Sequence, residues 1–340
     1  MNIAVLAGGY SHERDVSLTS ASLISNALID EGHKICLCDV YLGCDIKDKD
    51  VMFTDTKTEI HKIENSVPDL DALKAQSGNG DALIGKNVIE LCKMADVVFL
   101  ALHGSMGENG QLQATLDNFG IKYTGSGYVG SLLAMDKDIT KKLFKFSGVV
   151  TPEWIRCGRD ANIDEIIEKI GFPCVVKPTS SGSSVGISLV ADKEELVRAL
   201  DVAVKYEDSI IVEKQIIGRE FTVGVLDGKV LPVIEIIPTK GFYDYENKYQ
   251  AGKTKEICPA QISESLKEKL SEQTLLAFKT LRLSGYARFD FLADENENTY
   301  CLEANTLPGM TPTSLLPQMA AAVGISYGKL CTKIIETALN

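Results

Sequence analysis

The sequence predicts a multidomain α/β protein with an open parallel sheet at its N-terminus, and three observations lead to this fold class. The chain has 340 residues, more than one ordinary core accommodates, so two or three domains that share a cleft are expected. The first third alternates apolar strand-like runs with helical segments, a pattern typical of parallel sheets. Near the C-terminus, two strand-like segments carry polar side chains at alternating positions.

The strand–helix alternation occupies residues 1–126. The apolar run 2–9 ends in a glycine turn, as buried parallel strands do. The pattern then predicts helices over about 17–31, 83–94 and 111–119, and strands over 33–41, 96–103 and 121–124. Residues 43–88 are otherwise polar and irregular. Loops at the carboxyl ends of these strands are expected to contact a ligand.

Two further units follow, at residues 127–214 and 215–340. The first predicts helices over 137–147 and 192–206 and strands over 172–177 and 209–214, a small α+β arrangement. In the second, Asp227-Gly228 lies between strand-like residues 221–225 and 230–237, a strong hairpin signal. A long polar loop, 238–259, precedes a helix over 263–283 and the two C-terminal strands. A final helix over about 326–339 is expected to close this last unit.

Composition argues against several classes of protein. A net charge of −12 disfavours a nucleic-acid partner, whose phosphates would be repelled. The nine cysteines include no Cys-x-x-Cys pair and are expected to be buried reduced thiols. We find no secretory leader and no run near the ~18 apolar residues of a membrane span, so a cytoplasmic protein is expected.

The most informative segment contains Arg288 and Asp290 on one strand and Glu303 and Asn305 on the next. Side chains two residues apart on a strand share a face. If the strands pair through the polar turn 294–298, all four side chains converge. Three oxygen ligands beside a guanidinium suit Mg²⁺ that carries nucleotide phosphates. The segment therefore predicts an ATP-using enzyme.

Other segments offer weaker signals for phosphate and nucleotide binding. The Gly/Ser-rich loop 179–186 follows Lys177 and could present backbone N–H groups to phosphate, although it is not a Walker A loop. Lys137 is a further phosphate candidate. Glu213 and Glu220 follow an apolar strand and could hold adenine and ribose, but ordinary surface carboxylates fit the same pattern.

Three loops have the composition of substrate-binding elements. Residues 240–253 are rich in tyrosine and predict a lid rather than an unstructured insertion. Glu13 precedes a helix N-terminus and could bind an ammonium group, while the helix end could hold a carboxylate. His103 ends a buried strand, where a ligand contact and a structural role are both open. Gly8-Gly9 lacks the Gly-x-Gly-x-x-Gly pattern of dinucleotide sites.

Together the motifs of this chain resemble those of the D-alanine–D-alanine ligases of the ATP-grasp superfamily, essentially from end to end. They are His12-Glu-Arg-Asp-Val-Ser, Leu102-His-Gly, Gly107-Glu-Asn-Gly, Met135-Asp-Lys, Val176-Lys-Pro, Gly182-Ser-Ser-Val-Gly, Val212-Glu-Lys, Gly218-Arg-Glu-Phe-Thr-Val, Phe242-Tyr-Asp-Tyr-Glu-Asn-Lys-Tyr, Ala287-Arg-Phe-Asp, Leu302-Glu-Ala-Asn-Thr and Pro308-Gly-Met-Thr.

The resemblance implies an ATP-grasp fold of three α/β domains: residues 1–126, a central domain 127–214 and a C-terminal domain 215–340 with the lid 238–259. The nucleotide is expected between the central and C-terminal domains. The implied reaction joins two D-alanines for peptidoglycan precursors, through a D-alanyl phosphate, with ATP and Mg²⁺, for which Mn²⁺ is an expected substitute. A homodimer is the implied assembly.

The resemblance also assigns site residues. The implied metal ligands are Asp290, Glu303 and Asn305. The implied ATP contacts are Lys137, Lys177, Ser183, Ser184, Glu213, Lys214, Glu220 and Lys248. Substrate contacts are expected from Glu13, His103, Arg288, Ser314 and Leu315. The implied catalytic residues are Glu13, Ser183, Tyr249, Arg288 and Gly309, with Glu13 hydrogen-bonded to Ser183 and Tyr249 across the closed lid.

Three alternatives remain open. A resistance-type ligase would join D-alanine to D-serine or D-lactate; Lys248-Tyr249 disfavours D-lactate, and the apolar Leu315-Leu316 pair disfavours D-serine. A non-catalytic nucleotide-binding relative is disfavoured by the complete set of polar residues on the two C-terminal strands. A nicotinamide dehydrogenase is disfavoured by the missing glycine pattern.

Overall fold

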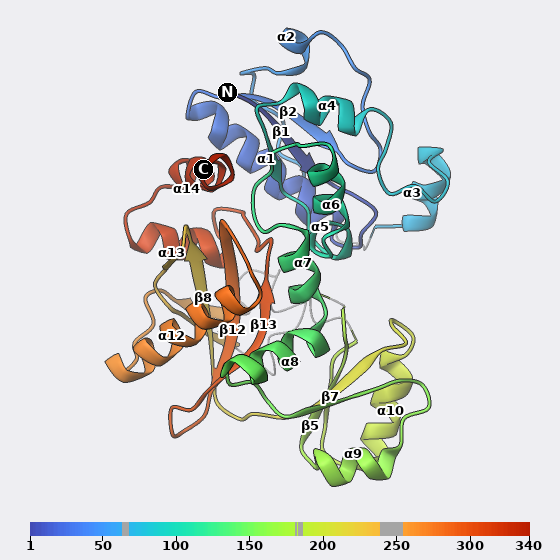
Figure 1. Ribbon diagram of the computed structural model, residues 1–340, viewed down its shortest axis with the longest axis vertical. Helices are drawn as coiled ribbons and strands as arrows, with labels where there is room; N and C mark the ends of the chain where they lie inside the picture. Colours follow the sequence, from blue (N-terminus) through green and yellow to red (C-terminus); the bar gives the residue numbers. More distant parts are fainter. Residues whose placement is uncertain (63–67, 181, 183–185, 239–253) are drawn as a thin grey trace.

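The structure is a computed structural model, and it describes residues 1–62, 68–180, 182, 186–238 and 254–340. The predicted site residues Ser183, Ser184, Lys248 and Tyr249, and most of the predicted lid, lie outside the described residues. Three sheets of different architecture follow one another along the chain (Figure 1). No helix among the described ranges is long and apolar enough to cross a membrane.

The first sheet is parallel and three-stranded, in the order β2-β1-β3, and confirms the predicted open parallel sheet. Its strands are β1 (Asn2–Ala7), β2 (Lys34–Asp39) and β3 (Val97–Leu100). The surrounding helices are α1 (Arg14–Asp30), α2 (Lys49–Met52), α3 (Leu70–Ser77), α4 (Val88–Met94), α5 (Ser105–Glu108) and α6 (Gln111–Asn118).

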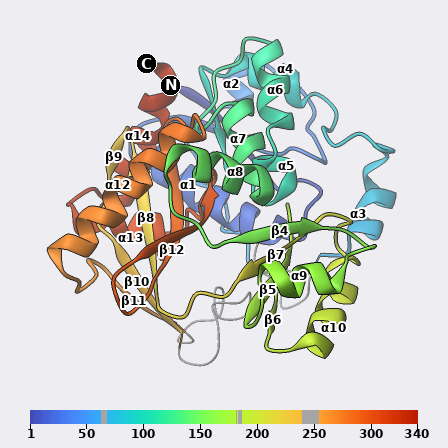
Figure 2. The ribbon, with the colours of Figure 1, turned by 60° about the horizontal axis from the view of Figure 1, so that its bottom comes forward.

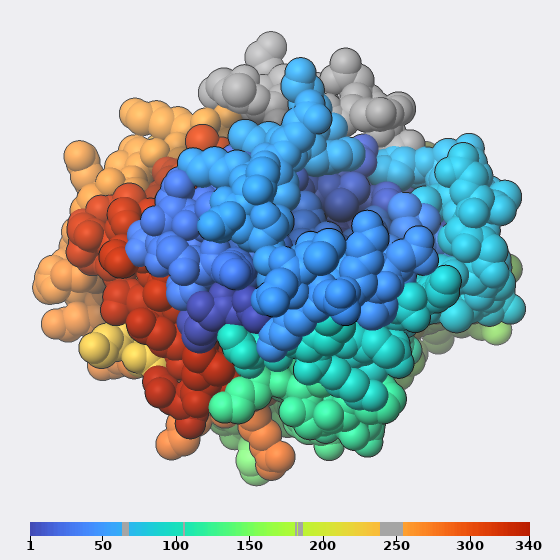
Figure 3. All heavy atoms as spheres, turned by 90° about the horizontal axis from the view of Figure 1, so that it is seen from above, coloured from blue at the N-terminus to red at the C-terminus, as the bar shows by residue number. Residues whose placement is uncertain are grey.

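Two predictions for this region need correction. The strand expected over 121–124 is reduced to a single bridge between Tyr123 and Val98. The final helix, α14 (Tyr327–Leu339), does not simply close the C-terminal unit, because it packs against α1 and β3. Figure 3 shows C-terminal atoms, in red, directly beside N-terminal atoms, in blue. Its apolar face, Leu330, Cys331, Ile334 and Ile335, is buried in the same core as the first sheet. The order of the elements along the chain did not indicate that α14 packs against the first sheet.

The second sheet is antiparallel, in the order β4-β7-β5-β6, and helices α9 and α10 pack on it (Figure 2). Its elements are β4 (Trp154–Cys157), α9 (Ile163–Lys169), β5 (Cys174–Pro178), β6 (Ser188–Val190), α10 (Lys193–Ala203) and β7 (Ile210–Lys214). Its core is separate from the others and includes Val176 and Val212. The predicted small α+β arrangement is therefore present.

The third sheet has six strands, with β11-β10-β8-β12-β13 in order and β9 paired to β8. They are β8 (Arg219–Leu226), β9 (Lys229–Val230), β10 (Ile234–Pro238), β11 (Thr254–Ile257), β12 (Tyr286–Ala293) and β13 (Thr299–Asn305). The hairpin at Asp227-Gly228 forms as predicted, with positive φ at both turn residues. Pro232, which lacks an N–H donor, lies in the break between β9 and β10.

One face of the third sheet is apolar and carries helices. Phe221, Phe289 and Phe291 lie in a core that also contains residues of α12 (Glu264–Thr280) and of α8 (Lys137–Ser147). Ala134 of α7 (Tyr128–Met135) belongs to the same core. Helices α7 and α8 thus pack on the third sheet, although the predicted boundary places residues 127–214 in a central unit. The domain boundaries themselves stay a prediction.

A bulge in β13 decides which of its residues face the core. Asp290 pairs with Glu303, but Phe291 pairs with Cys301, so Leu302 is an extra residue between them. Because strand side chains alternate, one extra residue reverses the faces beyond it. Cys301 and Ala304 therefore both lie in the core, while Glu303 lies on the opposite face.

Candidate functional site

The two C-terminal strands place four predicted site residues together, as the sequence predicts. Arg288 of β12 pairs with Asn305 of β13. Two residues further along each strand, Asp290 pairs with Glu303. We call these four residues the sheet-face cluster. They share the face of the third sheet opposite Phe289 and Phe291, so the apolar alternation of the strands orients them.

Asp290 is the centre of the sheet-face cluster. Its carboxylate accepts hydrogen bonds from Arg288 Nε at 3.1 Å and Nη2 at 2.9 Å, and from Asn305 Nδ2 at 2.9 Å. The Thr222 hydroxyl, on β8, donates to the same carboxylate at 2.7 Å. Thr222 was not predicted from the sequence, yet it stands directly beside Asp290 in the sheet register.

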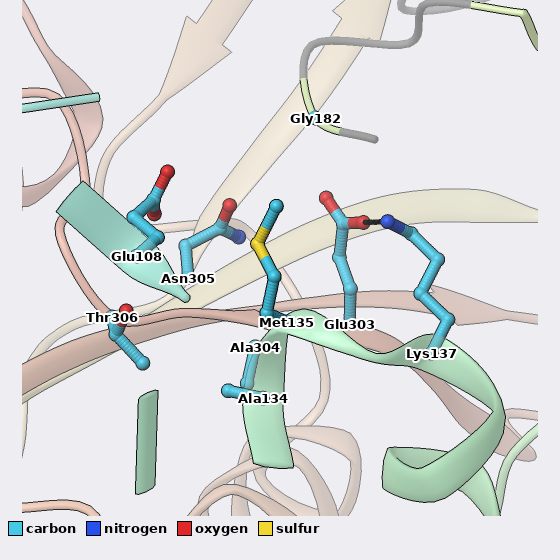
Figure 4. Close-up of a pocket in the computed structure, with 9 residues that line it drawn as sticks. All are labelled: Glu108, Ala134, Met135, Lys137, Gly182, Glu303, Ala304, Asn305 and Thr306. Carbon is cyan, nitrogen blue, oxygen red and sulfur yellow. Dashed lines mark ion pairs between the residues drawn. The ribbon is translucent and has the colours of Figure 1, made fainter. Parts of the chain in front are cut away.

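A pocket adjoins the sheet-face cluster, and four separate parts of the chain line it (Figure 4). Glu303 and Asn305 come from β13, Lys137 from the start of α8, and Glu108 from α5. The side chains of Glu303, Asn305 and Glu108 extend to the same side of the β13 backbone in Figure 4. The remaining lining residues are Ala134, Met135, Gly182, Ala304 and Thr306.

Lys137 brings a positive charge to this pocket, in the place predicted for a phosphate contact. Its Nζ lies 3.5 Å from Glu303 Oε2, and its side chain is only 9% exposed. Its backbone N–H donates to the carbonyl oxygen of Thr179 at 3.0 Å, which ties α8 to the residues after β5. The helix start is fixed by Asp136, whose side chain accepts from Ile139 N.

Glu108 is a site residue that the sequence analysis did not single out, although its motif was noted. Its carboxylate accepts the backbone N–H groups of Gly104 and, at 3.4 Å, of Leu307. Enclosure by the protein and then the charge of Glu13 raise the pKa of Glu108 to about 8. This shift favours the protonated form of Glu108. Its place in a glycine-rich turn just after a strand was the available signal.

The loops after β1 and β3 bring Glu13 and His103 to the same region. Glu13 is the N-cap residue of α1, but its side chain makes no capping hydrogen bond. A Cβ added to Gly104 would lie 3.0 Å from Glu13 Oε2, and one added to Gly182 would lie 3.6 Å from it. The Glu13 carboxylate therefore lies between two glycine loops. The two glycines belong to different units of the chain, so the Glu13 carboxylate lies where these units approach each other.

His103 is buried at the end of the strand-like run that contains β3. Its Nε2 lies 3.4 Å from the Ser20 hydroxyl. Burial lowers the pKa of His103, and the Arg288 guanidinium acts in the same direction, while Glu13 opposes them. His103 thus lies in the protein interior rather than at the surface, and its role as a substrate contact stays a prediction.

Lys177 and Glu213, both predicted ATP contacts, form a buried ion pair. Lys177 Nζ donates to Glu213 Oε1 at 2.6 Å, and Lys141 Nζ lies 2.8 Å from Glu213 Oε2. We call these three residues the Glu213 cluster. Burial acts to raise the pKa of Glu213, but the two lysines outweigh burial and lower it to about 2. Lys141 was missed from the sequence because it looks like an ordinary helix lysine.

The residues predicted for the second subsite lie at the start of α13 (Leu315–Ala322) and in the segment just before it. A Cβ on Gly309 would lie 3.0 Å from the Ser314 hydroxyl, so these two predicted residues are neighbours. The Ser314 hydroxyl accepts from Thr311 N at 3.1 Å, just before α13. Leu315 is almost fully buried, and Leu316 is a core residue with no exposed surface. Leu316 therefore does not form the wall of an open subsite.

Two further predicted nucleotide contacts among the described residues, Lys214 and Glu220, lie on β7 and β8. The Lys214 side chain is exposed at the end of β7, while its backbone N–H donates to Glu153 O at 2.8 Å. Glu220 is half-buried on β8, next to Leu292 of β12 in the register. The structure places both near the ends of strands at the junction of the second and third sheets.

The sheet-face cluster has the oxygen atoms that Mg²⁺ prefers. The described residues contain no group of three His, Cys, Asp or Glu side chains suited to a metal ion. The predicted set has two carboxylates and one amide, which is too few for a complete protein cage. Mg²⁺ is commonly held by one or two carboxylates plus substrate phosphates, and this donor set fits that arrangement.

Comparisons with known proteins agree with the motifs. The family model "D-ala D-ala ligase N-terminus" matches residues 2–126, and "D-ala D-ala ligase C-terminus" matches residues 137–336. The chain is 42% identical over 343 residues to a D-alanine–D-alanine ligase of Pediococcus pentosaceus, which covers 98% of this chain and 97% of the relative.

Solved structures give the same result. A D-alanine–D-alanine ligase of Bacillus anthracis complexed with ATP superposes with a TM-score of 0.78 at 34% identity, covering 100% of this chain and 97% of that one. The VanG D-Ala:D-Ser ligase of Enterococcus faecalis gives a TM-score of 0.78 at 28% identity, with 99% of each chain covered. The chain belongs to the D-alanine–D-alanine ligase family, whose two family models together span nearly its whole length.

Proposed function

We propose that this protein uses ATP to join two D-alanine molecules into D-alanyl-D-alanine, a peptidoglycan precursor. The observation that carries the proposal is the sheet-face cluster beside Lys137, in a pocket that α5 of the N-terminal unit also lines. Such a pocket brings a nucleotide-phosphate site and an amino-acid site together. Family membership and an ATP-bound relative support the same activity.

The proposed reaction has two steps. The carboxylate of the first D-alanine attacks the γ-phosphorus of ATP, which forms D-alanyl phosphate and releases ADP. The amine of the second D-alanine then adds to the carbonyl carbon, and phosphate leaves from the tetrahedral intermediate. A proton leaves the amine as the new amide bond forms.

The residues of the chain have separate roles in this proposal. Glu13 binds the ammonium group of the first substrate, and His103 helps orient its carboxylate. Arg288 holds the reacting carboxyl group and then the negative charge of the tetrahedral intermediate, with the Gly309 N–H as a second donor. Ser314, the neighbour of Gly309, is placed to bind the carboxylate of the second substrate.

Nucleotide binding is assigned to the remaining predicted residues. Lys137 and Lys177 contact phosphates, Glu213 and Lys214 lie at the adenine, and Glu220 holds the ribose. Asp290, Glu303 and Asn305 would hold Mg²⁺, which when bound neutralises charge on the β- and γ-phosphates. For this, Asp290 would have to exchange part of its contact with Arg288 and Asn305.

The experiment that tests this function is ADP release by the purified protein with Mg²⁺-ATP and D-alanine, D-serine, D-lactate or L-alanine. Mass spectrometry identifies the products. D-alanyl-D-alanine as the main product is the expected result. A main product of D-alanine with D-serine would instead place the chain with the D-Ala:D-Ser ligases, and no turnover with any of these acids would refute the proposal. Omitting Mg²⁺ should abolish turnover, and Mn²⁺ should restore it.

The lid is expected to protect the acyl phosphate from water. Tyr249, which lies outside the described residues, is proposed to connect the lid to Ser183 and Glu13. Replacing Tyr249 with alanine should raise the ratio of ADP released to dipeptide formed. This ratio is measured in one reaction mixture. An unchanged ratio would count against the proposed role of Tyr249. A homodimer, which the family resemblance implies, and a cytoplasmic location are likewise proposals.

A further inference from the structure

Lys141 is a fully buried lysine to which the proposed reaction assigns no role. Its side chain has no exposed surface, and its Nζ lies 2.8 Å from Glu213 Oε2. The same ammonium donates to the Thr151 hydroxyl at 2.7 Å and to the Pro152 carbonyl oxygen at 3.2 Å. The Trp154 ring lies 5.4 Å from it. Removing a lysine ammonium from water costs free energy, and these partners offset that cost.

The position of Lys141 connects the two parts of the site. Lys141 follows Lys137 by four residues on α8, so both side chains lie on the same side of the helix. Lys137 reaches the pocket and Glu303, while Lys141 reaches the central strand β7 of the second sheet. The same face of α8 therefore supplies Lys137 to the third sheet and Lys141 to the second sheet.

The charges in the Glu213 cluster are unequal. Two ammonium groups contact one carboxylate, and all three side chains are at most 7% exposed. In their ordinary ionic forms the two lysines carry one positive charge each and Glu213 carries one negative charge, and the lysines lower the pKa of Glu213 to about 2. The cluster therefore has a net charge of +1.

This excess charge changes what Lys177 can do. Without Lys141, Lys177 would be the sole counterion of Glu213, and moving it to a phosphate would leave a buried carboxylate unpaired. Breaking a buried ion pair in that way is strongly unfavourable. With Lys141 present, Glu213 keeps a counterion when Lys177 turns to a phosphate.

We propose that Lys141 is a positioning residue for the nucleotide: it neutralises Glu213, so that the charge of Lys177 is available to the polyphosphate. The proposal rests on the ATP site assigned under the proposed function. It makes a specific prediction, because the effect concerns phosphate charge rather than recognition of the adenine ring. Lys141 should matter for ATP and much less for adenosine.

The test compares Lys141→Met with Lys145→Met, which lies one turn further along α8. Lys145 also faces the Trp154 ring, but it is exposed and pairs with Glu153 at the surface. Binding of ATP is measured by calorimetry, and binding of adenosine by competition. Lys141→Met should weaken ATP binding about tenfold or more and adenosine binding less than about threefold. Lys145→Met should change neither. Equal losses for ATP and adenosine, or no loss for ATP, would overturn the proposal.

A second comparison covers the case in which Lys141→Met does not fold. In a Glu213→Gln background there is no carboxylate to neutralise, so adding Lys141→Met should change ATP affinity less than about threefold. A further tenfold loss in the double variant would overturn the proposal. Because these assays measure binding directly, they are separate from dipeptide formation. A wild-type protein that binds ATP but makes no dipeptide would contradict the proposed function and not this inference.

Discussion

The sheet-face cluster and the Glu213 cluster are both networks of hydrogen-bonded charges, but their charge balance differs. The sheet-face cluster contains one guanidinium, two carboxylates and a neutral amide, a net charge of −1 before its contact with Lys137. The Glu213 cluster contains two ammonium groups and one carboxylate, a net charge of +1. An excess of carboxylate suits a cation, and an excess of ammonium suits a phosphate.

The two clusters also differ in the elements that support them. The sheet-face cluster lies on neighbouring strands of one sheet, so strand register alone sets its geometry. The Glu213 cluster combines β5 and β7 with α8, whose apolar residues pack on the third sheet. The first is thus a local product of strand pairing, while the second depends on the way two units pack together.

The largest expected effect concerns Arg288. If Arg288 stabilises the transition state, Arg288→Ala should lower kcat on the order of 10²–10³-fold. Steady-state dipeptide formation measures this. Arg219→Ala is the matched control, because Arg219 lies on β8 of the same sheet and pairs with Glu235 at a more exposed position. It should change kcat less than about twofold. A loss below about tenfold for Arg288→Ala would refute its assignment.

The Glu213 cluster should respond differently, through nucleotide affinity. Lys177→Met removes the charge that we assign to a phosphate, so KM for ATP should rise about tenfold or more, with a smaller change in KM for D-alanine. Lys169→Met, at an exposed pair with Glu165, is the control and should leave both constants unchanged. If Lys177→Met lowered kcat as strongly as Arg288→Ala and left KM for ATP unaltered, the contrast between the clusters would be wrong.

The last predicted effect is on stability rather than on activity, and it concerns Glu108, which lines the same pocket as Glu303 and Asn305. Its pKa rises from 4.5 to about 8 on folding, so the folded protein binds a proton more tightly than the unfolded chain. This contribution to stability is complete below about pH 4.5 and is lost as pH rises towards 8. Between pH 5 and 8, the free energy of unfolding of the wild type should therefore fall relative to that of Glu108→Gln.

Urea unfolding at pH 5, 6.5 and 8 measures this difference. Glutamine keeps the acceptor oxygen for the N–H groups of Gly104 and Leu307 but does not titrate. If the free energy of unfolding of the two proteins changed with pH in the same way, the pKa of Glu108 would not be raised in the folded protein.

Much of the fold could be predicted because the relevant signals are local. The alternation of apolar and polar residues predicted the pairing of β12 with β13, and Asp227-Gly228 predicted its hairpin. Helix α8 has the predicted bounds, 137–147. The prediction of a strand over 121–124 was wrong, because an alternation of four residues fits a single bridge as well as it fits a strand. The return of α14 to the first sheet depends on packing between distant segments.

For the site, the sequence determined which residue types are present and which of them share a strand face. Arg288 with Asp290, and Glu303 with Asn305, follow from a side-chain period of two. The family resemblance supplied the expected chemistry. Glu108 and Lys141 were not predicted as site residues, because a carboxylate in a turn and a lysine on a helix have no distinctive sequence pattern until their neighbours in the fold are known.

Only the tertiary structure decided how these residues are combined. The extra residue Leu302 lets Cys301 face the core and Glu303 face the pocket, although an unbroken strand would put both on one face. Lys141 becomes a buried counterion only because the fold brings its Nζ within 2.8 Å of Glu213 Oε2 on β7. Periodicity acts between neighbours in the chain, whereas burial and ion pairing depend on distances between segments far apart in sequence, and those distances are set when the units pack.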